Sequence, residues 1–130
     1  LPAYCVDASL RQCYDKIIRP AIERFNPDFI LISAGFDAHW SDPLANLQLS
    51  TSGYYTITRD LLQVADHLCD GRIAFVLEGG YDPEALADNV GTVLCALAER
   101  KPREDRLGPA PVDEPNISQL IDELRGIHSL

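Results

Sequence analysis

The sequence predicts an α/β fold in which short parallel strands alternate with helices. Two apolar runs carry this prediction, at residues 28–33 and 72–77, and neither shows the polar alternation of a strand with one solvated face. Apolar residues at intervals of three and four precede the first run, separate the two runs and follow the second. Helices between successive strands imply parallel strands with right-handed crossovers and helices on both faces of the sheet.

The first helix is predicted over residues 9–25, where apolar residues form one broad face. Asp7 or Ser9 is placed to cap its start. Pro20 lies inside the pattern and removes one backbone hydrogen bond, which predicts a kink or a split at that point. The Asn-Pro pair at 26–27 ends the helix before the first strand.

The first strand runs into a long loop, predicted over residues 34–50. Hydroxyl residues at 50–52 can cap a second helix, expected over about residues 52–69, because apolar positions recur there with helical spacing. The Asp-Gly pair at 70–71 is a typical stop signal for a helix. The second strand follows directly.

A tight turn, Glu-Gly-Gly-Tyr-Asp at residues 78–82, follows the second strand. Asp82 is positioned to cap a third helix, and Pro83 suits its first turn. The apolar pattern of this helix continues to about Arg100.

The remaining sequence divides the chain into three parts, with residues 1–100 as the main unit. Residues 101–115 hold four prolines and mixed charge, which predicts a linker or a segment draped over the surface. Residues 116–130 are expected to form a short amphipathic helix and a tail, capped by Asn116 or Ser118.

Composition limits the classes of partner. The chain has 130 residues, the length of one domain, and a net charge of −9. That charge argues against nucleic acid as a direct partner, because phosphate binding needs a basic patch, and it suits a cationic substrate. No apolar run approaches the roughly 18 residues of a transmembrane helix, so no membrane partner is expected.

Cysteines and strand count add two expectations. Cys5, Cys13, Cys69 and Cys95 have spacings that match no zinc-binding pair, and we expect free thiols in a reducing, cytoplasmic compartment. The chain contains no methionine, and two apolar strands with open edges make a poor sheet. We therefore expect a fragment whose strands pair with others outside this chain, or which self-associates through its sheet edges.

Chemical groups gather where the two strands end. Asp37, His39 and Asp42 follow the first strand, and Tyr81 follows two glycines after the second. Carboxyl ends of parallel strands share one edge of a sheet, where ligands bind in open α/β folds. Carboxylates and imidazoles ligate metals, and a tyrosine hydroxyl can donate a hydrogen bond to a developing oxyanion.

Together these two segments resemble the zinc-dependent histone deacetylase family. The carrying sequences are SAGFDAHWSDPL at residues 33–44 and VLEGGY at residues 76–81. The bacterial and class II-like members, including acetylpolyamine and acetoin-utilisation-type deacetylases, are the most similar. The resemblance covers about residues 1–98, and the tail after Lys101 carries none of it.

The resemblance implies the C-terminal part of an arginase–deacetylase fold, a three-layer parallel-sheet architecture whose sheet is incomplete in this chain. It implies a zinc-dependent hydrolase that removes acetyl groups from acetyl-lysine, polyamines or small amines. The residues that it implies are Asp37 as a zinc ligand, Tyr81 as the catalytic oxyanion donor, Leu44, Gly79 and Gly80 beside the substrate, and Asp42 and Pro43 as loop-shaping residues.

Other parts of the family's site are missing from this sequence. The upstream Asp-x-His zinc motif and the pair of catalytic histidines are absent, and the three histidines do not replace them. His39 stands at a position that varies in the family, and His67 and His128 are expected at the surface. We therefore expect the fragment alone to bind zinc weakly or not at all and to be inactive.

Two alternatives remain open at this point. Asp37, His39 and Asp42 have nearly the spacing of the D-x-D-x-x-D-P motif of binuclear manganese ureohydrolases, although the turn at 78–81 does not fit that family. The chain could instead be a non-catalytic subdomain that associates through its sheet edges and C-terminal helix.

Overall fold

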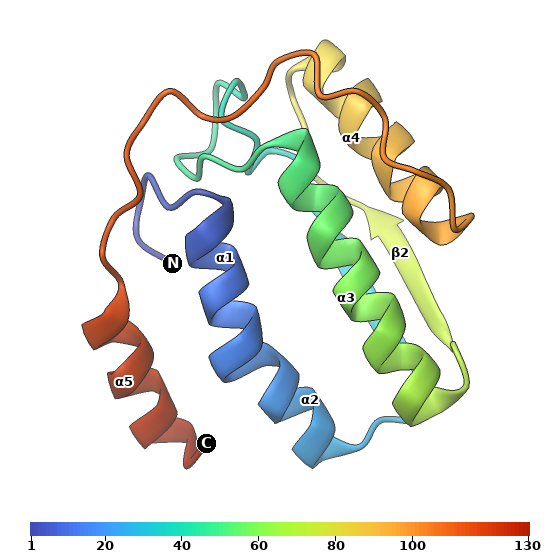
Figure 1. Ribbon diagram of the computed structural model, residues 1–130, viewed down its shortest axis with the longest axis vertical. Helices are drawn as coiled ribbons and strands as arrows, with labels where there is room; N and C mark the ends of the chain where they lie inside the picture. The colour runs from blue at the N-terminus through green and yellow to red at the C-terminus, as the bar shows by residue number, and fades with distance from the viewer.

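A computed structural model describes all residues, 1–130, and confirms alternating helices and parallel strands (Figure 1). Strands β1 and β2 pair in parallel, with Ile30 opposite Ile73 and Ala34 opposite Leu77. The elements in chain order are α1 (Asp7–Cys13), η1 (Tyr14–Ile18), α2 (Arg19–Phe25), β1 (Ile30–Ala34), α3 (Thr51–Cys69), β2 (Ile73–Leu77), α4 (Pro83–Leu97) and α5 (Ser118–His128).

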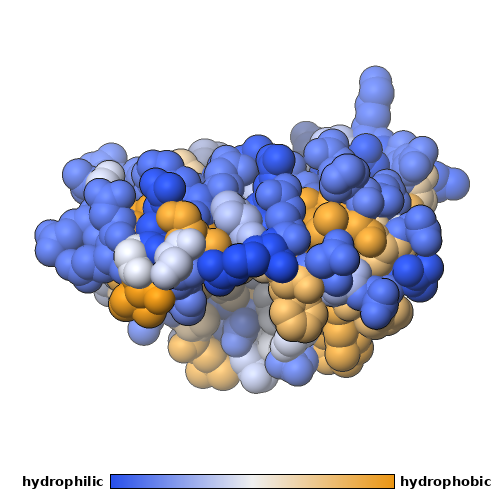
Figure 2. Space-filling model, turned by 90° about the horizontal axis from the view of Figure 1, so that it is seen from below, coloured by the Kyte–Doolittle hydropathy of each residue, from blue (hydrophilic) through white to orange (hydrophobic).

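The helices cover only one face of the two-stranded sheet. Ile30 and Ile32 point toward the helices and contribute to the main apolar core, whereas Leu31, between them in sequence, is 64% exposed. Figure 2 shows apolar atoms gathered along the lower side of the molecule and polar atoms along the upper side. The expectation of strands covered on both faces is wrong within this chain, because no element of residues 1–130 packs on the second face.

The first helical segment continues through Pro20 instead of breaking there. A π-helical turn, η1, joins α1 to α2 just before the proline. A proline lacks the N–H that an α-helical turn would use, and its ring crowds the preceding turn. A wider, π-helical turn is one way in which a helix accommodates the proline. The predicted caps of this helix are wrong: Val6 occupies the N-cap position without a side-chain bond, and Asp7 binds Ser50 instead.

Helices α3 and α4 begin as their sequences predict. The Ser50 hydroxyl accepts a hydrogen bond from the Gly53 N–H (3.0 Å), and Asp70, the C-cap residue after α3, has the left-handed conformation. Asp82 caps α4, which ends at Leu97, three residues before the predicted end. Neither helix, nor any other in the structure, is long and apolar enough to cross a membrane.

Three apolar clusters hold the elements together. The largest joins α3, η1 and β1, with Tyr14, Leu61 and Val64 at its centre. A second lies beneath the loop at residues 36–49 and includes Phe36 and Tyr54, whose rings lie 5.2 Å apart. The third fixes α5, because Ile117 and Ile121 pack against Cys5. All four cysteines are free thiols.

The start of α5 differs from the predicted cap. Ile117 occupies the N-cap position and provides no side-chain bond, since it is apolar. The Asn116 carboxamide oxygen instead accepts a hydrogen bond from the Ser118 N–H (2.9 Å). The Asn116 side chain thus stabilises the turn that precedes α5 and does not cap the helix itself.

Candidate active site at the carboxyl ends of the strands

The backbone pairing of β1 and β2 continues into the loops that follow them. The Glu78 N–H donates to the Ala34 carbonyl (3.1 Å), and the Phe36 N–H donates to the Gly79 carbonyl (2.8 Å). These two bonds bring Asp37 beside Gly79 at the carboxyl edge of the sheet. The two segments that sequence analysis singled out therefore lie side by side.

The Asp37 carboxylate lies in a space that two glycines leave open. A Cβ atom on Gly79 would lie 2.6 Å from Asp37 Cγ, and one on Gly35 would lie 3.0 Å from Asp37 Oδ1. Any larger residue at position 79 would displace the carboxylate. Asp37 forms no hydrogen bond or ion pair within the structure, so its oxygens are available to a ligand.

Asp42 uses its carboxylate differently. Oδ2 accepts hydrogen bonds from the backbone N–H groups of Tyr81 (2.6 Å) and Asp82 (3.2 Å), and Oδ1 accepts from the Leu44 N–H (2.9 Å). The side chain is buried. One carboxylate thus connects the loop after β1 to the turn after β2, and it fixes the backbone of Tyr81.

Ser41 makes a second connection between the same two segments. Its hydroxyl donates to Asp82 Oδ2 (2.8 Å), while Asp82 Oδ1 accepts from the first N–H groups of α4. The Ser41 hydroxyl, followed by the N–H of Ala85, lowers the pKa of Asp82 by stabilising its charged form. Asp82 therefore serves both as a helix cap and as an anchor for the loop.

His39 is buried within this arrangement. Its Nδ1 accepts a hydrogen bond from the Ser41 N–H (3.2 Å), and its Nε2 is buried without a partner. Burial lowers the pKa of His39, so the neutral imidazole is favoured. The other two histidines, His67 and His128, are exposed, as expected.

The implied substrate-side residues are accessible. Tyr81 is 56% exposed and Leu44 is 67% exposed, and neither side chain is covered by another part of the chain. Gly80 has a φ of 133°, and a Cβ there would lie 2.8 Å from Leu86 Cδ1, so the turn requires glycine at this position. Pro43 is exposed in the loop between Asp42 and Leu44.

The residues of this chain fit one metal ligand and no complete set. No group of three or more His, Cys, Asp or Glu side chains in the structure could hold a metal ion. Asp37, His39 and Asp42 do not form such a group, and the Asp42 carboxylate already accepts hydrogen bonds from backbone N–H groups. This arrangement does not support the ureohydrolase hypothesis, which needs all three side chains to face a metal.

Ser41 was not predicted to be part of the site, and the second role of Asp82 was not predicted either. A serine in a loop carries no distinctive signal by itself. Its contribution depends on a carboxylate 41 residues away, whose only visible sequence signal was its position before Pro83. Trp40 was likewise not predicted to contact the tail.

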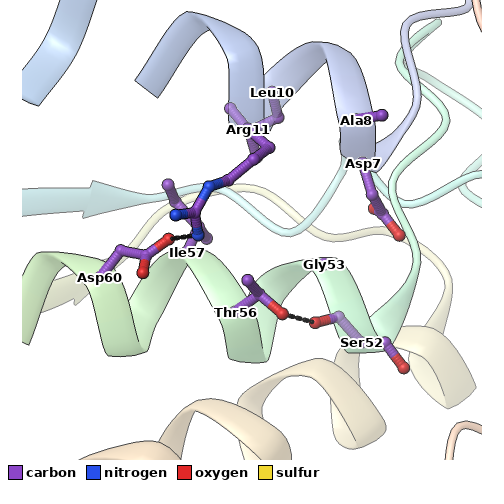
Figure 3. Close-up of a pocket in the computed structure, with 9 residues that line it drawn as sticks. All are labelled: Asp7, Ala8, Leu10, Arg11, Ser52, Gly53, Thr56, Ile57 and Asp60. Carbon is purple, nitrogen blue, oxygen red and sulfur yellow. Dashed lines mark hydrogen bonds and ion pairs between the residues drawn. The ribbon is translucent and has the colours of Figure 1, made fainter. Parts of the chain in front are cut away.

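A separate cavity lies between α1 and α3. It has a volume of about 300 Å³, and none of the residues at the carboxyl ends of the strands lines it. Figure 3 shows Arg11 of α1 reaching across to Asp60 of α3, and Gly53 faces Asp7 at the other end. Arg11 pairs with Asp60, and Asp7 accepts hydrogen bonds from Ser50, so the charged groups that line the cavity are already engaged.

Comparisons with known proteins identify the family of the chain. A family model described as "Histone deacetylase domain" matches residues 1–97. Histone deacetylase 14, chloroplastic, of Arabidopsis thaliana is 41% identical over 134 residues, which cover 100% of this chain and 32% of that protein. A probable deacetylase of Archaeoglobus fulgidus is 43% identical over 100 residues, covering 75% of this chain and 28% of that protein.

A solved structure supports the same fold. The crystal structure of the HDA15 HD domain superposes with a TM-score of 0.74 at 26% identity, covering 97% of this chain and 32% of that one. The chain thus spans about a third of the length of the relatives that it matches. The family-model match ends at residue 97, as expected, whereas the alignment with the Arabidopsis relative also includes the tail. The chain belongs to the histone deacetylase family and forms part of its α/β arginase–deacetylase fold.

Proposed function

We propose that the protein is a zinc-dependent amidohydrolase that removes acetyl groups from acetyl-lysine or acetylated amines. Residues 1–130 would supply one zinc ligand, Asp37, and one oxyanion donor, Tyr81. The observation that carries the proposal is the pairing of Phe36 with Gly79, which sets the unpaired Asp37 carboxylate against the turn that leads to Tyr81. Membership of the family makes deacetylation the reaction that suits these two groups.

The chemistry assigns distinct roles to the residues. A bound zinc ion would polarise the acetamide carbonyl and activate a water molecule. Asp37 would hold that ion with a carboxylate that no hydrogen bond competes for. The Tyr81 hydroxyl would donate a hydrogen bond to the oxygen that becomes negatively charged, and Asp42 would keep the Tyr81 backbone in place.

The substrate follows from the surroundings of the site. Leu44 would line the entry for the acyl chain, since it is exposed two residues after Asp42, and Gly79 and Gly80 leave space beside Asp37. The net charge of −9 favours a cationic acetylated amine, such as a lysine side chain or a polyamine. Nucleic acid and membranes are not proposed as direct partners.

Substitutions at Tyr81 and Asp37 test the proposal in the intact protein that contains these residues. Tyr81→Phe should lower kcat for an acetyl-lysine peptide by about 10²- to 10³-fold without loss of zinc, because only the donor is removed. Asp37→Asn should lower zinc content as well as turnover. His67→Gln, at an exposed position far along α3, is the matched control. Unchanged turnover in Tyr81→Phe would contradict the assignment.

Residues 1–130 produced alone are proposed to be inactive and to hold no zinc, because they present a single ligand. The uncovered sheet face and strand edges should make that fragment self-associate. Turnover with and without added zinc tests the first statement, and size-exclusion chromatography with light scattering tests the second. A cytoplasmic location, proposed from the free cysteines, is tested by imaging the tagged protein.

A further inference from the structure

Residues 98–117, here named the strap, connect α4 to α5 without any helix or strand. They lie beyond residue 97, where the match to the deacetylase family model ends. Figure 1 shows the strap running back along α4, crossing the end of the molecule where the site loops lie, and descending to α5. Its path therefore brings it to the loop that carries Asp37.

The strap is fastened to α4 by an ion pair. The Arg106 guanidinium makes two hydrogen bonds to the buried carboxylate of Asp88, from Nε (2.9 Å) and from Nη2 (3.0 Å). Two parallel bonds fix both distance and orientation, and they replace the water that the buried carboxylate has lost. Near its start, the strap also accepts a hydrogen bond from the Tyr55 hydroxyl at the Arg100 carbonyl (2.9 Å).

Asp105 shapes the part of the strap that meets the loop. Its Oδ1 accepts from the Gly108 N–H (2.8 Å), and its Oδ2 accepts from the Ser52 N–H (3.1 Å) in the first turn of α3. The carboxylate thus closes a turn in the strap and joins that turn to α3. Gly108 has a φ of 72°, and its carbonyl accepts a hydrogen bond from Trp40 Nε1 (3.0 Å).

Trp40 directly precedes the two residues that connect the site loop to the turn at 78–82. The two residues that follow it, Ser41 and Asp42, are those that bind the turn of Tyr81 and Asp82. The loop has little regular structure of its own apart from a single bridge between His39 and Leu49. A restraint on the Trp40 indole is therefore a restraint on the segment that holds Tyr81.

We propose that the strap sets the geometry of the active-site loop, with Asp105 and Trp40 as positioning residues. The path runs from Asp105 to the Gly108 carbonyl, to the Trp40 indole, and through Ser41 and Asp42 to Tyr81. The catalytic consequence rests on the proposed function, whereas the structural consequence does not. Residues beyond the family match would then belong to the catalytic unit.

The test uses Trp40→Phe and Asp105→Asn in the intact protein. Trp40→Phe keeps an aromatic ring and removes the indole N–H, and Asp105→Asn keeps the size and removes the charge that accepts two N–H groups. Amide hydrogen exchange by mass spectrometry is measured on peptides covering 36–49 and 78–82. Arg24→Gln is the matched control, because Arg24 bonds the His128 carbonyl (2.6 Å) at the far end of the tail.

Both variants should speed exchange in these two peptides by about five- to tenfold, the effect of losing one restraining hydrogen bond. They should lower kcat while KM changes by less than about twofold, because the Tyr81 donor moves but binding groups remain. Exchange that stays at the wild-type rate would overturn the proposal. So would an equal change in Arg24→Gln, which would indicate a global loss of stability. The hydrogen-exchange rates test whether the strap restrains the loop, even if the turnover measurements contradict the proposed deacetylase activity.

Discussion

Helix α3 and the loop at residues 36–49 before it are fixed by contacts of different range. In α3, the Ser50 cap bonds Gly53 three residues on, and the helix stops at its own Asp70. In the loop, Asp42 bonds Tyr81 and Trp40 bonds Gly108, which are 39 and 68 residues away. Local contacts define where α3 begins and ends, whereas the path of the loop depends on the turn at 78–82 and on the strap.

The largest expected effect is on the loop, from Gly79→Ala. The added Cβ would lie 2.6 Å from Asp37 Cγ, so the carboxylate must move. We expect kcat to fall by about 100-fold and zinc content to fall with it, since a displacement of about 1 Å at a catalytic group has costs of this size. The measurement is turnover together with metal analysis of the intact protein.

Gly126→Ala is the control for this substitution. Nothing lies within 4 Å of a Cβ at Gly126, which sits in α5. That variant should keep full activity and zinc content, and alanine in a helix should slightly raise stability. Equal turnover in the two variants would contradict the claim that catalysis needs the space that Gly79 leaves beside Asp37.

The next largest effect is expected from Asp42→Asn, which weakens the connection between the loop at 36–49 and the turn at 78–82. Asp42→Asn replaces an acceptor by an amide in a buried position that faces three backbone N–H groups. We expect kcat to fall by about tenfold and the free energy of unfolding to fall by about 1–3 kcal/mol, because at least one N–H loses its partner. Steady-state kinetics and urea unfolding measure the two quantities. Glu84→Gln, exposed on α4, should change neither.

A change in α3 should affect stability and spare catalysis. The Thr51 hydroxyl donates to Asn89 Oδ1 (2.7 Å) in a buried contact between α3 and α4. Thr51→Val should lower the free energy of unfolding by about 1–2 kcal/mol with kcat unchanged, because the contact lies outside the loop. The Thr56 hydroxyl donates to the exposed Ser52 carbonyl, one turn earlier in α3. The free energy of unfolding of Thr56→Val should therefore stay within about 0.5 kcal/mol of wild type. A fall in kcat for Thr51→Val would show that α3 and the loop are coupled.

The same division explains which features the sequence could predict. The existence of α3, its cap and its stop could be predicted from residues within the helix or directly beside it, and so could the capping of α4 by Asp82. The uncovered sheet face could not be read from strands whose apolar pattern suits burial on both sides. The contacts of Ser41, Asp42 and Trp40 could not be predicted either, because each depends on a partner that only folding brings near. Placing Asp37 beside Gly79 was possible, since parallel strands bring their carboxyl ends together.

The smallest effect concerns acid stability and the link between Ser41 and Asp82. The Ser41 hydroxyl is the largest cause that lowers the pKa of Asp82 below its ordinary value of 3.8. The folded protein therefore binds this proton less readily than the unfolded chain, so the bond stabilises the fold above about pH 4 and the stabilisation is lost as pH falls through the folded-state pKa.

Ser41→Ala should raise the pKa of Asp82 and leave the variant less stable than wild type at neutral pH, with the two stabilities converging in acid. Unfolding measured across pH 3–7 tests this, with Ser118→Ala, exposed at the start of α5, as the control. A difference between Ser41→Ala and wild type that persists unchanged at pH 3 would mean that the serine acts through packing and not through the Asp82 charge.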